Sequence, residues 1–273
     1  MISHNPVKII TSAICIAFVA FACSCQGINR NGHTEYPRTE AGELMKVSLP
    51  ENTPNQLIPY TGFVVGFNPE HHIPNYVAWE LLATETDGPI PRAKKFTTDT
   101  EAPGCPTTDD YRNSGFDRGH MAPAGDMKWD SRAMDACFML TNICPQDKKL
   151  NSGSWAKLEE KCRAWARRDS SLIIVCGPVL SDRLTRTIGE NKVTVPERFF
   201  KVILAPYADP PRAIAFIMPN SQVAGGMQAA VTTVDNVEAI TGLDFFSALP
   251  DDLEAEVESK SSFPLWEKKQ KKR

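Results

Sequence analysis

Asp117, Arg118, Gly119 and His120 place a carboxylate, a guanidinium and an imidazole on one short segment that contains a glycine hinge. Histidine titrates near neutral pH, so its imidazole can accept a proton from water. Arginine stays charged, and its planar fork matches the oxygens of a phosphate. These residue types together indicate hydrolysis of a phosphate ester.

A second group of residues follows downstream at helical spacing. Asn151, Trp155, Glu159 and Arg163 are each four residues apart, so a helix that starts at Asn151 would carry them on one slowly drifting ridge. Glu159 and Arg163 could alternatively form a simple surface salt bridge, worth about 0.2–0.5 kcal/mol. That alternative explains the two charges, but it explains neither the amide nor the preceding His120 motif.

His120 is the natural candidate for a general base. The other histidines lie near the N-terminus or in the adjacent pair His71 and His72, which is expected to make a loop or partner contact and not to bind a metal. The neutral Asn151 suits magnesium, which keeps much of its water and is often bound by one or two protein oxygens plus substrate phosphate. The residues are thus compatible with one-metal hydrolysis.

The elements that position these groups are helices and strands mixed along the chain. The strongest helical period predicts a helix over residues 154–168, where Trp155, Leu158, Cys162 and Trp165 form a buried stripe. Asp130 is expected to cap a shorter helix. Apolar runs predict strands at residues 62–67, 76–83, 171–176, 198–205 and 212–218. We expect an α+β fold, with a mainly antiparallel sheet flanked by helices.

The start of the chain reads as an export signal. Lys8 precedes an apolar run from Ile9 to about Cys23 that is too short to span a bilayer comfortably. Small residues before Cys23 and Cys25 resemble a bacterial lipoprotein processing site. A lipid-anchored protein is favoured over a released soluble one, and the expected location is the periplasm, the outer membrane or the cell exterior.

Composition and charge restrict the possible partners and divide the chain into segments. The chain has 273 residues and a net charge of −3, so any contact with nucleic acid must come from a local basic cluster. We divide it into a signal (1–25), a flexible polar tether (26–55), one catalytic domain (56–250) and a charged, solvated tail (251–273).

Five cysteines follow the signal and are expected to be mostly small buried hydrophobic residues, although an exported protein could form one or two disulfides.

The segment around Asp117 to His120 and the segment from Asn151 to Arg163 resemble the DNA/RNA non-specific endonuclease family of ββα-metal (His-Me finger) nucleases. The resemblance covers about residues 60–220 and includes Trp79 and the segment 196–202. It implies that the fold contains a ββα-metal motif. It also implies a magnesium-dependent endonuclease that cleaves both DNA and RNA, with Mn²⁺ as the alternative ion.

The resemblance also implies a role for each site residue. His120 would be the general base, held in one tautomer by a hydrogen bond from its other ring nitrogen. Asn151 would be the sole direct protein ligand of the metal, and Glu159 would orient metal-bound water. The remaining residues would contact the phosphate and transition state (Arg118 and Arg163) or shape the site (Asp117 and Asn142).

Two rival functions remain compatible with the sequence. One is a non-catalytic exported protein that uses the same fold to bind nucleic acid or another partner, and the other is a phosphodiesterase for a small substrate that is not a nucleic acid. Some family members use an arginine in the strand near Trp79, where this chain has Glu80. An inhibitor protein is a further candidate partner, and the sequence leaves the oligomeric state open.

Overall fold

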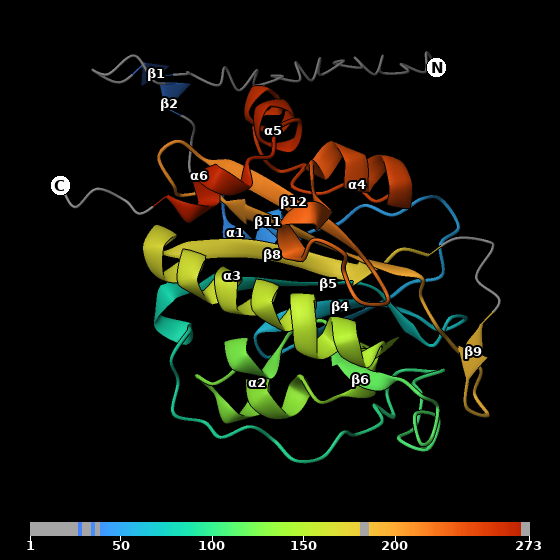
Figure 1. Ribbon diagram of the computed structural model, residues 1–273. Helices are drawn as coiled ribbons and strands as arrows, with labels where there is room; N and C mark the ends of the chain where they lie inside the picture. Colours follow the sequence, from blue (N-terminus) through green and yellow to red (C-terminus); the bar gives the residue numbers. More distant parts are fainter. Residues whose placement is uncertain (1–26, 29–33, 36–38, 181–185, 269–273) are drawn as a thin grey trace, which may run out of the picture. The chain divides into compact units, whose positions relative to one another are not determined.

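The computed structural model describes residues 27–28, 34–35, 39–180 and 186–268 (Figure 1). The expected signal segment, residues 1–25, lies outside these residues. The chain forms two compact units, Met1–Pro37 and Arg38–Arg273. In the first unit, strands β1 (Gly27–Ile28) and β2 (Thr34–Glu35) pair antiparallel. The second unit contains all the elements described below.

A seven-stranded sheet forms the centre of the second unit, in the order β13-β12-β11-β8-β5-β4-β3. Every neighbouring pair is antiparallel, which confirms the predicted α+β class. All eight residues of β8 are buried, as expected for a central strand with both faces covered. The strands are β3 (Gln56–Tyr60), β4 (Phe63–Asn68), β5 (Ile73–Leu82), β8 (Ser171–Pro178), β11 (Arg198–Ala205), β12 (Arg212–Pro219) and β13 (Val231–Thr232).

Helices cover both faces of this sheet. Figure 1 shows α2 (Ser131–Ala136) and α3 (Ala156–Asp169) on one side, and α4 (Val234–Thr241) and α5 (Asp251–Glu258) on the other. Side chains of β11 alternate between the two faces. The Phe199 ring packs against Trp155 at the start of α3, with ring centroids 5.7 Å apart, whereas Phe200 packs against Phe245 at 5.6 Å.

A small hairpin and the helix that follows it form the ββα unit. Strand β6 (Asp117–His120) pairs antiparallel with β7 (Ile143–Gln146), so that His120 lies opposite Ile143. A π-helical turn, η4 (Leu150–Trp155), leads into α3 and has a kink at Gly153. Asp130 accepts hydrogen bonds from the backbone N–H groups of Arg132 and Ala133, so it caps α2 as predicted.

Shorter elements complete the second unit. Four 3₁₀ turns and one further strand pair lie between the larger elements. They are η1 (Ala83–Glu85), η2 (Ala124–Asp126), η3 (Leu140–Asn142) and η5 (Met227–Ala230), with β9 (Thr187–Ile188) paired to β10 (Val193–Thr194). No helix among the described residues is long and apolar enough to cross a membrane.

Residues 39–55 differ from the expected tether. Helix α1 (Ala41–Leu44) buries Leu44 completely, and Val47 is also buried. Ser48 forms an isolated antiparallel bridge with Asp244, far along the chain. The prediction of a flexible tether is wrong for this stretch. Most of its residues are polar or turn-forming, and composition alone did not reveal that its few apolar residues are buried.

The expected charged tail is also wrong over residues 251–268. Helix α5 buries Leu253 and Val257, and α6 (Phe263–Glu267) buries Phe263 and Trp266. The Trp266 ring lies 4.8 Å from that of Trp165 in α3. The prediction counted the charged residues of this segment. It overlooked that such residues can occupy the exposed face of an amphipathic helix whose other face is buried.

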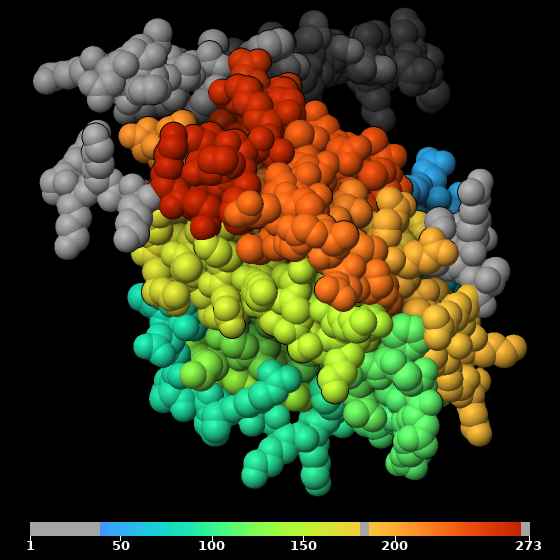
Figure 2. Space-filling view, in the orientation of Figure 1, coloured from blue at the N-terminus to red at the C-terminus, as the bar shows by residue number. Residues whose placement is uncertain are grey.

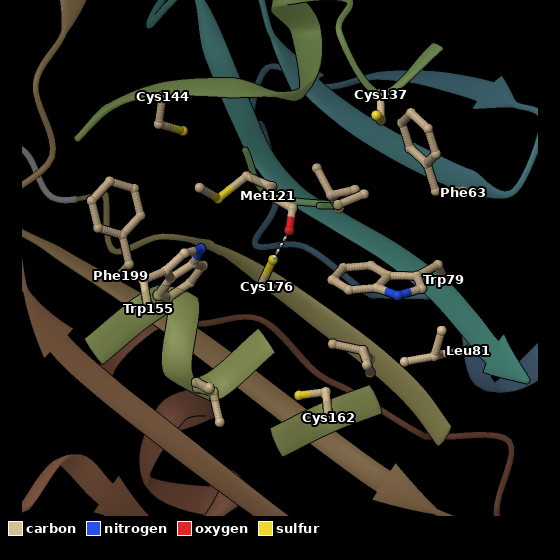
Figure 3. Close-up of a cluster of buried hydrophobic side chains, with 14 of the residues drawn as sticks. Phe63, Trp79, Leu81, Met121, Cys137, Cys144, Trp155, Cys162, Cys176 and Phe199 are labelled. Carbon is tan, nitrogen blue, oxygen red and sulfur yellow. Dashed lines mark hydrogen bonds between the residues drawn. The ribbon is translucent and has the colours of Figure 1, made fainter. Parts of the chain in front are cut away.

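The five cysteines among the described residues are free thiols, and all except Cys105 are buried. Figure 3 shows Cys137, Cys144, Cys162 and Cys176 at separate places in the hydrophobic core. The Cys176 thiol donates a hydrogen bond to the backbone oxygen of Met121 at 3.3 Å. The prediction that most of the five are small buried hydrophobic residues is confirmed.

Candidate active site

His120 lies at the end of β6, buried against two aromatic rings that also contact each other. Its imidazole is 4.7 Å from the Phe138 ring and 5.3 Å from the Phe96 ring, measured between centroids. Burial lowers the pKa of His120 to about 3, and the positive charge of Arg92 contributes. The imidazole is therefore neutral at physiological pH, the form in which it can accept a proton.

The second ring nitrogen does not make the expected hydrogen bond. Nε2 of His120 is buried and has no hydrogen-bond partner among the described residues. The ring is positioned instead by its two aromatic neighbours and by the backbone, because Trp155 Nε1 donates to the His120 carbonyl oxygen at 3.2 Å. Packing thus replaces the tautomer-fixing bond that the family resemblance implies.

Asn142 shapes the loop that follows His120. Its side chain is fully buried, and its amide nitrogen donates to the carbonyl oxygens of Ala122 at 2.9 Å and Cys137 at 2.8 Å. Its Oδ1 accepts from the Ala122 N–H at 2.9 Å. These bonds satisfy the buried amide, so Asn142 is a positioning residue with no free atom aimed at a substrate.

Gly119 allows the two hairpin strands to approach closely. A Cβ at this position would lie 2.6 Å from Cβ of Gln146 on β7, closer than two carbons can pack without one of them moving. Glycine at position 119 is therefore a packing requirement that keeps Arg118 and His120 in register with β7.

Asn151 is held against β6 by Asp117. Nδ2 of Asn151 donates to Oδ2 of Asp117 at 3.0 Å. This bond fixes the orientation of the amide and leaves Oδ1, the atom that binds hard cations, free of it. An oxygen donor beside the carboxylate of Asp117 fits Mg²⁺ or Mn²⁺, which prefer oxygen ligands and an excess of negative charge.

Glu159 lies half-buried on α3 and is surrounded by charges from other elements. Burial raises its pKa to about 7, whereas the positive charges of Lys201, Arg163 and Arg92 oppose that rise. A carboxyl group with a pKa near neutrality can exchange a proton with water under physiological conditions.

Lys201 is a fully buried cation that sequence reasoning did not assign to the site. Its side chain has no exposed surface, and its Nζ has no hydrogen-bond partner among the described residues. The ammonium lies 4.4 Å from the Trp155 ring centroid and 5.1 Å from that of Trp79. Burial by itself would lower the pKa of Lys201, but surrounding groups that include Glu159 and Asp126 raise it, so the lysine stays charged.

Arg163 pairs with Asp126 and not with Glu159. Its Nη1 donates to Oδ1 of Asp126 at 2.8 Å, and the other carboxylate oxygen accepts from Trp79 Nε1 at 3.2 Å. A Cβ on Gly125 would lie 2.6 Å from this Nη1, so the glycine leaves room for the guanidinium. The alternative of a simple surface salt bridge between Glu159 and Arg163 is therefore wrong.

Arg118 packs between aromatic rings next to β6. Its guanidinium carbon lies 5.3 Å from the Phe96 ring centroid and 5.7 Å from that of Tyr111. Nη2 donates to the carbonyl oxygen of Thr108 at 2.8 Å, and Nε is buried with no hydrogen-bond partner in the described residues. These contacts fix the orientation of the Arg118 guanidinium group without neutralising its charge.

Arg92 is a second site residue that the sequence analysis missed. Its guanidinium lies 4.9 Å from the Phe138 ring centroid, on the ring that borders His120. Its charge influences the pKa values of both His120 and Glu159. The signal was present as a basic run, Arg92, Lys94 and Lys95, just before Phe96. Glu80, in contrast, accepts a hydrogen bond from the Ser171 hydroxyl at 2.5 Å.

The histidine pair in the β4–β5 turn makes separate contacts. Nδ1 of His71 is 3.0 Å from the Thr194 hydroxyl, and Nδ1 of His72 is 2.7 Å from the Gly104 carbonyl oxygen. The two rings therefore do not share a ligand position, as the sequence analysis expected.

The predicted site residues lie on β6, η3, the π-helical turn and α3, and proteins of known function share this fold. A model of the DNA/RNA non-specific endonuclease family matches residues 40–252. The chain belongs to this family. The matched region begins well before residue 56 and includes α1, which agrees with the burial of Leu44 in the structure.

The sequence is also similar to individual nucleases of this family. Mitochondrial nuclease EXOG of Danio rerio is 36% identical over 207 residues, which cover 70% of this chain and 60% of the relative. Human mitochondrial endonuclease G is 32% identical over 219 residues, or 75% of this chain and 73% of the relative. This chain spans 56–60% of the length of the EXOG nucleases that it matches.

A solved structure shares the fold of this endonuclease-family chain. The EndoG/EndoGI complex contains a chain that aligns with a TM-score of 0.68 and 26% sequence identity. The alignment covers 78% of this chain and 94% of the other. This match agrees with the ββα-metal motif built by β6, β7 and α3.

Proposed function

We propose that this protein is a metal-dependent endonuclease that hydrolyses phosphodiester bonds of DNA and RNA. The hydrogen bond between Asn151 and Asp117 carries the proposal, because it joins a metal-binding amide to the strand that ends in His120. Membership of the DNA/RNA non-specific endonuclease family supports the same activity. The preferred ions are Mg²⁺ and, as an alternative, Mn²⁺.

His120 acts as the general base in this proposal. The neutral imidazole accepts a proton from the attacking water, which then forms the new bond to phosphorus. In the free protein His120 is a weak base for removing a proton from water, because burial disfavours its protonated form, the imidazolium. A phosphodiester bound next to the ring would bring negative charge and favour the imidazolium, so substrate binding makes His120 a stronger base.

Asn151 would hold the metal through Oδ1, and Glu159 would orient the water on it. Such an ion, when bound, neutralises the scissile phosphate and stabilises the departing oxygen. Arg118, Arg163 and Arg92 surround the same region and would contact the phosphate and the transition state. The buried pair of Arg163 with Asp126 holds one of these cations in a fixed position.

Export and lipid anchoring also remain proposals. The apolar run after Lys8 and the small residues before Cys23 and Cys25 support a signal with lipidation at one of these cysteines. The matched EXOG and endonuclease G relatives are named as mitochondrial proteins. Metabolic labelling with a fatty acid, compared between Cys23→Ala and Cys25→Ala, tests the anchor. The EndoG/EndoGI structure supports a search for an inhibitor protein as well.

The test of activity uses supercoiled plasmid and single-stranded RNA as substrates. The protein is expected to cleave both with Mg²⁺ and neither with EDTA, and His120→Ala is expected to lose about 10²–10⁴-fold in rate. His71→Ala, in the β4–β5 turn, is the matched control and should cleave normally. Cleavage of neither polymer would favour a binding protein or a small-molecule phosphodiesterase, and equal rates for His120→Ala and wild type would remove His120 as the base.

A further inference from the structure

Three carboxylates from two helices converge on the face of the sheet opposite α3. Asp235 and Glu238 lie on α4, and Glu258 is the last residue of α5. One oxygen from each lies within 4.8 Å of the other two. Figure 1 shows α4 and α5 next to each other, and Figure 2 shows this orange-to-red region at the surface, beside the yellow surface of α3.

Glu258 is buried without a partner. Its side chain is 5% exposed, and its Oε1 is buried with no hydrogen-bond partner among the described residues. Burial raises the pKa of Glu258 to about 9, and the neighbouring carboxylates of Glu238, Glu254, Asp235 and Asp244 raise it further. A buried carboxylate in this setting needs either a proton or a cation.

The described part of the protein supplies no cation to these five carboxylates. None of them forms a salt bridge within residues 39–180 and 186–268. Lys260, two residues beyond Glu258, pairs with the exposed Glu256 at 2.9 Å. Glu238 is oriented by a hydrogen bond that its Oε1 accepts from the Phe245 N–H at 2.9 Å. The excess negative charge is therefore available to an ion from solution.

We propose that Asp235, Glu238 and Glu258 bind a calcium ion that joins α4 to α5. The ligand set contains only carboxylate oxygens, which favours hard cations over zinc or copper. Ca²⁺ takes six to eight oxygen ligands in flexible geometry and accepts several carboxylates, whereas Mg²⁺ demands near-ideal octahedral geometry and releases its water reluctantly. The three carboxylate oxygens, all within 4.8 Å of one another, are close enough to be held by one ion at Ca²⁺–oxygen distances of about 2.3–2.6 Å.

The calcium site is structural and separate from catalysis. Helices α4 and α5 pack on β11 and β12, on the side of the sheet away from α3 and the His120 hairpin. The ion would neutralise the buried Glu258 and link two short helices of eight residues each. Its expected effect is greater stability of the C-terminal part, with little change in the rate of phosphodiester cleavage.

Calorimetric titration of the metal-free full chain with CaCl₂ tests the proposal. The parent protein carries Asn151→Ala, so that the catalytic metal site does not contribute. We expect one Ca²⁺ per chain, with affinity at least about tenfold weaker in Asp235→Asn and in Glu258→Gln. Asp235 is exposed, so that variant tests the site without disturbing the core. Glu256→Gln, on the same helix, is the matched control and should bind as the parent does.

The thermal midpoint separates loss of the site from loss of the fold. Calcium should raise the midpoint of the parent and of Glu256→Gln, but not that of Glu258→Gln. Without metal, Glu258→Gln should be at least as stable as the parent, because it removes a buried carboxylate that lacks a partner. No binding by the parent, or equal binding by the parent and both site variants, would overturn the proposal.

Discussion

The amide nitrogen of Asn151 donates to the carboxylate of Asp117 at 3.0 Å, across the junction between the π-helical turn and β6. This bond orients the amide oxygen that would bind the metal, and Asp117 is on the same short strand as His120. The proposed base and the proposed metal ligand are therefore positioned by one hairpin and one helix start.

Asp117→Ala is expected to weaken metal binding more than it slows the chemical step. Loss of the hydrogen bond frees the Asn151 amide to rotate, and partners of this kind are typically worth about 10–100-fold in metal affinity. The Mg²⁺ concentration for half-maximal plasmid cleavage should rise by about that factor, while the rate at saturating Mg²⁺ falls much less. An unchanged Mg²⁺ requirement would show that Asp117 does not orient the ligand.

The pH dependence of cleavage is expected to follow Glu159 and not His120. His120 has a pKa of about 3 in the free protein, so its imidazole is already neutral well below pH 7 before substrate binds. Glu159 has a pKa of about 7 and, in the proposed role of orienting metal-bound water, would act as the carboxylate. Cleavage should therefore increase with pH up to about 7, and higher Mg²⁺ should shift this limb to lower pH, since a cation favours the carboxylate. If the acid limb of the pH–rate profile does not move with Mg²⁺ concentration, the group that titrates there is not Glu159.

Lys201→Met is expected to raise the pKa of Glu159 and to destabilise the fold. The buried ammonium opposes the effect of burial on Glu159, so its loss shifts the acid limb of the pH–rate profile to higher pH. Removal of one partner of a buried charge cluster costs about 3–5 kcal/mol. Denaturant unfolding and the pH profile measure the two effects separately, and Lys161→Met, at the exposed pair with Glu267, is the control. A destabilised variant with an unshifted profile would restrict Lys201 to a structural role.

Asn142→Ala is expected to destabilise the loop after His120. The variant leaves the buried N–H of Ala122 and the carbonyl oxygens of Ala122 and Cys137 without their side-chain partner. Each unsatisfied buried group costs about 1–3 kcal/mol, so a loss of roughly 3 kcal/mol or more in unfolding free energy is expected. A loss below about 1 kcal/mol would mean that water or another group replaces the amide.

Local patterns in the sequence predict much of this site. The strands that carry apolar runs, the cap at Asp130 and the helix that carries Glu159 and Arg163 all depend on neighbours close in the chain. The predicted extension of that helix back to Asn151 is wrong, because the backbone is not helical at Gly153. The partner of Arg163 could not be predicted, because Asp126 is brought to α3 by the path of the chain between β6 and α2.

Long-range packing also explains the residues that sequence reasoning missed. Lys201 has the spacing of an ordinary strand residue, and only the sheet and α3 together bury it between two tryptophan rings. Trp266 belongs to a charged terminal segment, yet it packs on Trp165 from α3. Neither contact has a signal within one helix or strand.

The central claim is that the neutral imidazole of His120 removes a proton from the attacking water. Its most direct test is cleavage of plasmid by His120→Gly with and without added imidazole, at saturating Mg²⁺. The variant should be slower by about 10²–10⁴-fold and should recover part of the rate with imidazole, in proportion to its unprotonated form. Cleavage by His120→Gly at the wild-type rate, without imidazole, would contradict the claim.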